Sequence, residues 1–307
     1  MNADAVLLAT LALTALVDAA SVFPSVIKGD LHACVLHAFT TILSSPACQP
    51  AVVPEALPVF RRFVLSLARS TNTAATVEQL RSALSRLILI LRTAQKREHE
   101  TSVACERNAL LAGTILVTAA LPVLGGQGAL LGVFVDELAD CLANKMTTRV
   151  AAGLAKSLLL VPQAEEAAVH IARRLVPRLL AFLIAPSDID ETAEARRTVA
   201  QALSAFAAQV PVDRRAAALG VVVPALLQRA AVEGEGIWGE TSGRLVALAQ
   251  SAPDAFRGLV GGMVVRQKAF IEEVIRKGAL ASADGGQGRN HGTEEAKEPT
   301  IALKLDF

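Results

Sequence analysis

The histidines are the side chains in this sequence best suited to metal binding, and they are dispersed. His32 and His37 form the closest pair. Their spacing of five residues does not place two ligands on the same helix face, whereas a spacing of four does. His99 and His170 are isolated, and His291 lies in a polar segment near the C-terminus. The sequence therefore predicts no metal site.

The cysteines are equally dispersed. Cys34, Cys48, Cys105 and Cys141 form no C-x-x-C pair, and their neighbours in the sequence are apolar. None has a histidine in a sequence context that would suggest an activated thiolate. We therefore expect reduced thiols, most of them buried, in a cytosolic protein.

Motifs for nucleophilic catalysis and for phosphate binding are missing from the sequence. The glycine-rich stretches GGQG (125–128) and GGMVVRQK (261–268) lack the P-loop pattern G-x-x-x-x-G-K-[ST]. No G-x-S-x-G occurs, and acid pairs such as Glu165–Glu166 suit a polar helix face. We therefore predict no catalytic, cofactor-binding or metal-binding residue. The sequence is interpreted as that of a non-enzyme without a cofactor.

The charge pattern gives no sign of a nucleic-acid partner. Thirty basic residues nearly balance 29 acidic ones, and the net charge is +1. A nucleic-acid interface usually combines a basic stripe with aromatic side chains that stack on bases. Here the basic pairs are scattered, and aromatic residues make up 4% of the chain, with one Trp and no Tyr. We therefore expect protein partners and no nucleic acid.

Amphipathic helices must position these scattered polar groups. Apolar residues recur at i, i+3, i+4 and i+7 through almost all of residues 3–278, and most of them are Ala, Leu and Val. The predicted helices span residues 3–20, 29–44, 50–69, 74–98, 101–121, 128–143, 146–161, 165–184, 189–209, 213–231, 236–251 and 253–278. Their short connections favour antiparallel packing of neighbouring helices.

Val-Pro segments recur inside the predicted helices and suggest a repeat. Pro54, Pro177 and Pro224 each follow a valine, at separations of 123 residues, or three steps of 41, and 47 residues. Helix-pair HEAT and armadillo repeats have a period of about 40–47 residues. We expect Pro54 to lie in the first turn of its helix and Pro58 to kink that helix. The predicted fold is an all-α, HEAT/armadillo-like α-solenoid (an α-α superhelix).

Two apolar stretches imitate membrane signals. Residues 5–17 have the length of a signal-peptide core, but no Lys or Arg precedes Lys28. Residues 109–135 contain no charged residue and are long enough to span a bilayer, but LPVLGGQG interrupts them. We interpret 109–135 as two buried helices, with a transmembrane span as the alternative. Membrane association is expected to be peripheral and through partners only.

The helical array predicted over residues 1–278 does not begin with a typical end cap. The end of a solenoid needs a polar outer face, but helix 3–20 is apolar on nearly all sides. We therefore expect upstream HEAT repeats or another chain to cover this helix. The sequence is interpreted as the C-terminal part of a longer array.

The C-terminal end differs in kind from the array. Residues 279–298 are polar and glycine-rich and predict a disordered tether, and residues 299–307 predict a short extended peptide with one apolar face. The apolar side chains of this peptide are Ile301, Leu303, Leu305 and Phe307. The peptide either docks on the solenoid or binds a partner. We favour docking, because an exposed apolar terminus promotes aggregation.

Two blocks of sequence are more specific than generic repeat sequence. They are DLHACVLHAFTTILSSPACQPAVVPEALPVFRRFVLSL (30–67) and the closing PDAFRGLVGGMVVRQKAFIEEVIR (253–276) with EPTIALKLDF (298–307). Both blocks resemble the C-terminal region of the HEAT-repeat-containing protein five family, whose fungal members are the large accessory proteins of the Golgi clathrin adaptor. The resemblance runs along the whole chain and is densest in these blocks.

The resemblance implies a non-enzymatic role. Members of that family assist clathrin-adaptor recruitment and cargo traffic between the trans-Golgi network and endosomes, and animal members associate with aftiphilin and gamma-synergin. A cytoplasmic scaffold at the trans-Golgi network and endosomal vesicle surface is therefore expected, with the clathrin-adaptor complex or its accessory proteins as partners. It would serve endocytosis, retrograde endosome-to-Golgi transport and protein localisation. The alternative is a HEAT-repeat transport receptor or another protein-binding solenoid.

Overall fold

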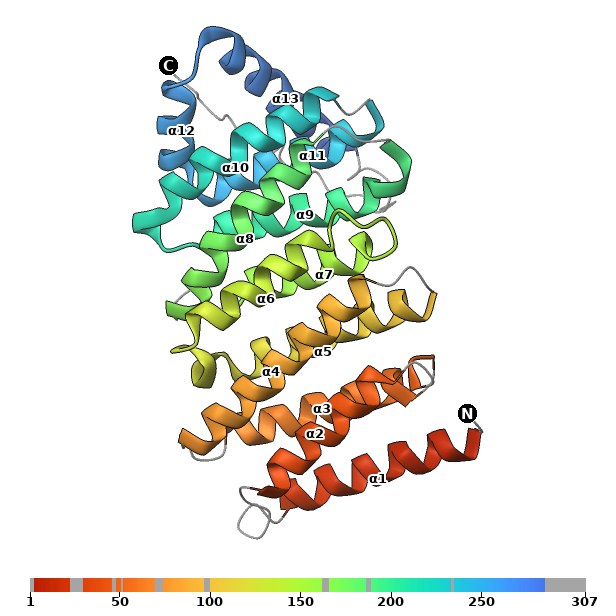
Figure 1. Cartoon of the computed structure of the whole chain (residues 1–307). Helices are drawn as coiled ribbons and strands as arrows, with labels where there is room; N and C mark the ends of the chain where they lie inside the picture. Colours follow the sequence, from red (N-terminus) through yellow and green to blue (C-terminus); the bar gives the residue numbers. More distant parts are fainter. Residues whose placement is uncertain are drawn as a thin grey trace, which may run out of the picture. The chain divides into compact units, whose positions relative to one another are not determined.

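The structure is a computed structural model, and it describes residues 3–22, 30–45, 48–50, 52–69, 74–96, 100–161, 166–185, 189–232 and 235–284. Thirteen helices and no strand occur in these ranges (Figure 1). The chain divides into two compact units, Met1–Leu203 and Ser204–Phe307. Each unit is described by itself below.

The first unit is built from helices that run through most of its length. They are α1 (Ala3–Val22), α2 (Asp30–Ser44), α3 (Val52–Arg69), α4 (Ala74–Gln95), α5 (Glu100–Leu124), α6 (Gly128–Asp140), α7 (Thr148–Leu159), α8 (Glu166–Ile184) and α9 (Ile189–Gln209), which continues into the second unit. Most begin and end within a few residues of the predicted bounds.

Helices that are two apart in the sequence pack side by side in this unit. The odd-numbered helices α1, α3, α5 and α7 follow one another in one layer, and the even-numbered helices α2, α4, α6 and α8 in a second layer. Neighbouring helices such as α4 and α5 join the two layers. This regular alternation is the arrangement of an α-solenoid, so the predicted all-α solenoid is confirmed.

Leucine, valine and alanine side chains fill the space between the layers. In α4, Leu80, Leu84, Leu87 and Leu91 are all buried, at the spacing of a single helix face. Burial of each such side chain contributes about 1.5–3 kcal/mol relative to exposure. The apolar periodicity of the sequence therefore becomes the interface between the layers.

The prolines affect the helices in different ways. Pro54 is the third residue of α3, and it lies in the first turn as predicted, where its missing N–H costs little. The same helix continues across Pro58 to its end at Arg69. An interruption is found instead in α5, where Ala120 has non-helical angles (φ −115°, ψ 19°) two residues before Pro122. A helix-interior proline explains this break, because its ring displaces the carbonyl one turn earlier.

The repeat length follows from contacts between helices of the same layer. Side-chain hydrogen bonds join Asp18 to Arg62, Arg92 to Glu137 and Lys156 to Gln201, at separations of 44, 45 and 45 residues. These three separations fit the period of about 40–47 residues that is typical of HEAT and armadillo repeats, whereas the Arg174–Asp136 pair between α6 and α8 spans 38 residues. The repeat period is therefore visible in the packing.

The Val-Pro segments do not all mark the same place in a repeat. Pro177 and Pro224 lie inside α8 and α10 (Val212–Val232), in the second half of each helix. Pro54 instead lies near the start of α3. Pro54 is thus not equivalent to the other two prolines, and the repeat inferred from aligning all three is wrong in that respect.

The second unit contains the end of α9 together with α10, α11 (Glu235–Ser251), α12 (Pro253–Gly261) and α13 (Val265–Asp284). Helix α10 packs on α11 and α12, and α11 packs on α12 and α13. The pattern of helices two apart thus recurs in this unit.

The single helix predicted over 253–278 is wrong, because α12 and α13 are separate helices. The Gly262 N–H donates to the carbonyl oxygens of Gly258 and Leu259, which closes the end of α12. Two consecutive glycines at 261–262 lower the helix propensity at this point. Helix α13 then continues to Asp284, so the first residues of the predicted tether are helical. The rest of the tether and the peptide 299–307 lie outside the described residues.

Candidate protein-binding surface

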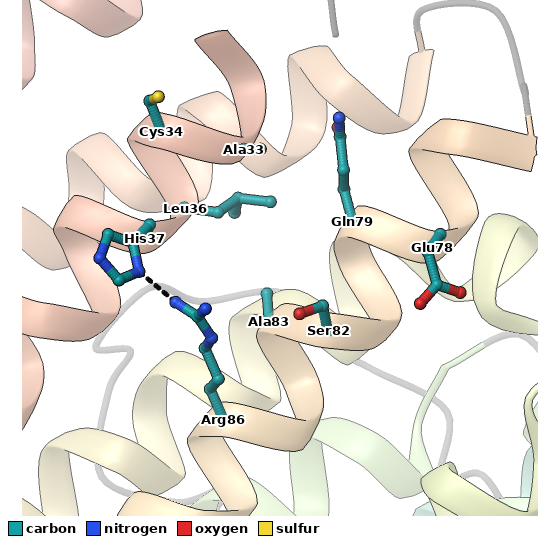
Figure 2. A pocket seen from close by; sticks show the side chains of 9 residues that line it. All are labelled: Ala33, Cys34, Leu36, His37, Glu78, Gln79, Ser82, Ala83 and Arg86. Atoms are coloured by element: carbon teal, nitrogen blue, oxygen red, sulfur yellow. Dashed lines mark hydrogen bonds between the residues drawn. The ribbon is translucent and has the colours of Figure 1, made fainter. Parts of the chain in front are cut away.

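A groove lies between α2 and α4 in the first unit, and its cavity volume is about 400 Å³ (Figure 2). Helix α2 lines it with Ala33, Cys34, Leu36 and His37, and α4 lines it with Glu78, Gln79, Ser82, Ala83 and Arg86. Two of these side chains are buried and form an apolar floor, namely Leu36 and Ala83. The exposed members around the floor are mostly polar.

Arg86 and His37 face each other across this groove (Figure 2). The Arg86 guanidinium donates a hydrogen bond to Nδ1 of His37, which must be unprotonated at that nitrogen to accept it. Among the described residues, no carboxylate pairs with Arg86. The positive charge of Arg86 is therefore uncompensated within this part of the chain.

Glu78, the acidic residue that lines the groove, is already paired with an arginine of its own helix. Glu78 accepts hydrogen bonds from Arg81 Nε at 2.8 Å and Arg81 Nη2 at 2.7 Å. These bonds hold the pKa of the Glu78 carboxyl below its ordinary value. Because Glu78 and Arg81 neutralise each other on α4, the charge that remains in the groove is that of Arg86.

The two histidines of α2 have different surroundings. The His32 ring packs edge-on against Phe63 of α3, with ring centroids 5.8 Å apart, and burial lowers the pKa of His32. His37 instead faces α4. The pair therefore does not converge on one site. No cluster of three or more His, Cys, Asp or Glu side chains suited to a metal occurs in the described part of the chain.

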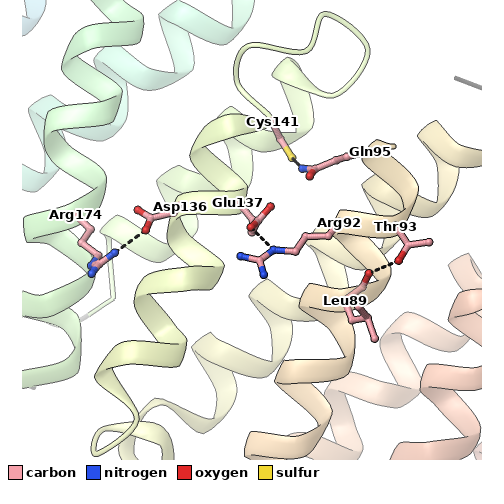
Figure 3. A network of polar contacts seen from close by, with 8 residues as sticks. All are labelled: Leu89, Arg92, Thr93, Gln95, Asp136, Glu137, Cys141 and Arg174. Carbon is pink, nitrogen blue, oxygen red and sulfur yellow. Dashed lines mark hydrogen bonds and ion pairs between the residues drawn. The ribbon is translucent and has the colours of Figure 1, made fainter. Parts of the chain in front are cut away.

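The other even-numbered junctions are closed by ion pairs (Figure 3). At the α4–α6 junction, Arg92 Nε lies 2.6 Å from Glu137 Oε1. At the α6–α8 junction, Arg174 Nη1 lies 2.6 Å from Asp136 Oδ2. Each of these arginines on the helix surface thus has a carboxylate from the neighbouring helix.

The cysteines differ widely in exposure. All four are free thiols, and Cys34 is exposed at the groove, Cys48 and Cys105 are half-buried, and Cys141 is buried. The prediction that most cysteines are buried is therefore wrong. Cys141 Sγ donates to Glu106 Oε1 at 3.1 Å. Burial, and then this hydrogen bond, raise the pKa of the Cys141 thiol well above its ordinary value, so it is protonated and unreactive.

Helix α1 presents apolar side chains to solvent. Leu7, Leu8 and Leu11 are 59%, 69% and 56% exposed, whereas Leu13 and Val17 of the same helix are buried. Helix α1 packs on α3. The face of α1 that does not meet α3 therefore lacks the polar cover typical of a solenoid end, as the sequence predicts.

One segment of α5, Ser102–Leu124, is long and apolar enough to cross a membrane. However, 67% of its apolar window is buried inside the protein, and α5 packs on α3, α4 and α7. The stretch 109–135 is divided between α5 and α6, as the interpretation of two helices requires. A core helix of the solenoid accounts for the apolar composition.

The groove residues other than Cys34 and His37 were not singled out by the sequence. Arg86 and Ser82 lie on the exposed side of the amphipathic helix α4, where polar side chains are expected in any soluble helix. Their proximity to α2 arises only from the packing of α2 against α4 within the even-numbered layer. The peptide residues Ile301, Leu303, Leu305 and Phe307 lie outside the described residues, as do His99 and His291.

Comparison with protein families gives a specific match. A family model described as LAA1-like, C-terminal TPR repeats, matches residues 127–288, which is more than half of the chain. TPR repeats, like HEAT repeats, are helix pairs that stack into solenoids. Comparison with curated proteins and with solved structures found no significant match.

Proposed function

The chain belongs to the LAA1-like family, and from that premise we propose that it is a non-enzymatic scaffold in clathrin-adaptor-dependent vesicle traffic. It would act between the trans-Golgi network and endosomes, in endocytosis, retrograde endosome-to-Golgi transport and protein localisation. The observation that carries this proposal is the family match over residues 127–288. It agrees with the resemblance of residues 30–67 to accessory proteins of the Golgi clathrin adaptor.

The physical character of the fold supports a binding role. A solenoid presents long, continuous helix faces on which partner proteins can dock, and such binding needs neither a cofactor nor a catalytic group. The proposed partners are the clathrin-adaptor complex or its accessory proteins. The scaffold would be cytoplasmic and would reach the vesicle surface through these partners.

The exposed face of α1 gives a second point of contact. We propose that another helical repeat, from upstream sequence or from another chain, covers Leu7, Leu8 and Leu11. Their exposure supports this, because the same kind of apolar contact joins α1 to α3 on its other side. The C-terminal peptide with Ile301, Leu303, Leu305 and Phe307 is proposed to dock on the helical array.

Affinity purification of the tagged chain from its source cells tests the trafficking role. We expect clathrin-adaptor subunits or their accessory proteins in the eluate, identified by mass spectrometry. A matched variant carries Leu8→Glu and Leu11→Glu on α1, which should retain adaptor recovery if a different face binds the adaptor. Recovery of transport cargo, with no adaptor component in any sample, would overturn the proposal in favour of the transport-receptor alternative.

A further inference from the structure

The three junctions of the even-numbered layer differ in one respect. At the α4–α6 junction Arg92 meets Glu137, and at the α6–α8 junction Arg174 meets Asp136 (Figure 3). At the α2–α4 junction the arginine meets a histidine instead of a carboxylate (Figure 2). Two junctions are thus electrically balanced, and the third carries an uncompensated positive charge in the described part of the chain.

We propose that the α2–α4 groove binds an extended acidic segment of a partner protein. A carboxylate of that segment would lie between Arg86 and His37 and would supply the negative charge that Glu137 and Asp136 supply at the other two junctions. A guanidinium and a carboxylate form strong, charge-assisted hydrogen bonds, and the ring N–H of His37 would add a second donor. The positive charge of Arg86 therefore favours an acidic segment as the occupant of the groove.

The shape of the groove suits a short peptide. Its volume of about 400 Å³ accommodates a few side chains. Leu36 and Ala83 provide a buried apolar floor for an aliphatic residue next to the carboxylate. The Ser82 hydroxyl on the same wall has no hydrogen-bond partner among the described residues, so it can bond to the peptide.

The α2–α4 groove adds a class of partner, an acidic segment, to the scaffold function proposed above. The biological meaning of this site rests on that proposed function. Its test uses the purified 307-residue chain and needs no trafficking component. Failure of peptide binding and failure of adaptor recovery are therefore separate results.

The first experiment measures binding by fluorescence anisotropy. The probe is a fluorescein-labelled peptide of about eight residues in which glutamate and leucine alternate, and the control peptide has glutamine in place of every glutamate. We expect saturable binding of the acidic peptide, at least about tenfold weaker binding of the control, and weaker binding at higher salt. Equal binding of both peptides would overturn the proposal.

Two variants locate the site. Arg86→Glu should weaken peptide binding by about tenfold to a hundredfold, because it replaces attraction by repulsion. His37→Glu should weaken it also, because it supplies a carboxylate to Arg86 within the chain. Arg61→Glu makes the same charge change at an exposed position of α3 outside the groove and should bind like the unchanged protein. Unaltered binding by Arg86→Glu, with a normal thermal melt, would contradict the proposal.

Cys34 gives a direct readout of the position of the peptide. It is the exposed cysteine among the four and lines the groove, so N-ethylmaleimide should alkylate it readily. The acidic peptide should slow this alkylation in the unchanged protein but not in Arg86→Glu, as measured by mass spectrometry. Peptide binding without protection of Cys34 would place the site elsewhere and would overturn the proposal.

Discussion

Cys34 and Cys141 show how position decides the chemistry of a thiol in this fold. Cys34 lies exposed at the groove, whereas Cys141 is buried at the end of α6 and donates to a buried carboxylate, that of Glu106. Asn144 donates to the other oxygen of Glu106 at 3.2 Å. The buried charge is thus held by hydrogen bonds, and these bonds in turn hold the proton on Cys141.

The raised pKa of Cys141 predicts a loss of stability at alkaline pH. An unfolded chain releases a thiol proton near pH 8.5, whereas folded Cys141 keeps it, so the unfolded state binds fewer protons above that pH. The contribution of the retained Cys141 proton to the free energy of unfolding is complete below pH 8.5. It falls by up to about 1.4 kcal/mol per pH unit above that pH. Urea unfolding at pH 7.5 and 9.5 measures this effect. Between these two pH values, the free energy of unfolding should decrease less in Cys141→Ala than in the unchanged protein.

Cys34→Ala is the matched control for that measurement, since its thiol is exposed in the folded protein. It should keep the pH dependence of the unchanged protein. The chain has no tyrosine, so no phenol titrates in the same interval. If Cys141→Ala and the unchanged protein lose the same free energy of unfolding, Cys141 does not retain its proton on folding.

Close approach between helices is the main constraint at the scale of elements. Gly113 of α5 lies against the ring of Phe134 of α6, and a methyl group at position 113 would overlap that buried ring. Gly113→Ala should therefore lower the free energy of unfolding by about 1–3 kcal/mol, the usual cost of overpacking. Thermal unfolding monitored by circular dichroism at 222 nm checks this, with an expected decrease of the midpoint.

Gly153 of α7 provides the opposite case on a neighbouring helix. A Cβ there meets open space, so Gly153→Ala should raise the free energy of unfolding by about 0.5–1 kcal/mol through helix propensity alone. Opposite shifts of the two midpoints are the expected result. A stabilised Gly113→Ala would mean that α5 and α6 do not approach as closely as the structure has them.

The sequence predicted helices well because their signal is local. The apolar period of α4 specifies which leucines are buried, and the structure buries the same face. The break between α12 and α13 was missed because the apolar period continues through it, and only the glycines at 261–262 mark the end.

The groove between α2 and α4 was not predicted for another reason. Arg86 and His37 are 49 residues apart, and only the packing of α2 against α4 within one layer joins them.

At the scale of the whole molecule, the composition and the family can be recognised from the sequence. The surface that binds a partner protein cannot. The balanced charges at the α4–α6 and α6–α8 junctions come from residues 38 or 45 positions apart. No periodic pattern distinguishes these pairs from the unbalanced pair at α2–α4. The binding surface proposed at α2–α4 is thus a local departure from the repeat, and it becomes visible only when neighbouring junctions are compared.

The C-terminal peptide 299–307 gives the last prediction, at the same scale. If its apolar side chains dock on the helical array, their burial would contribute a few kcal/mol, and its deletion should lower the thermal midpoint by several degrees. Leu303→Ser with Leu305→Ser should reproduce much of that decrease. Lys304→Ser with Asp306→Ser changes only the opposite face and should leave the midpoint unchanged. A deletion variant that melts like the intact chain would exclude docking, and the peptide would then be free to bind a partner.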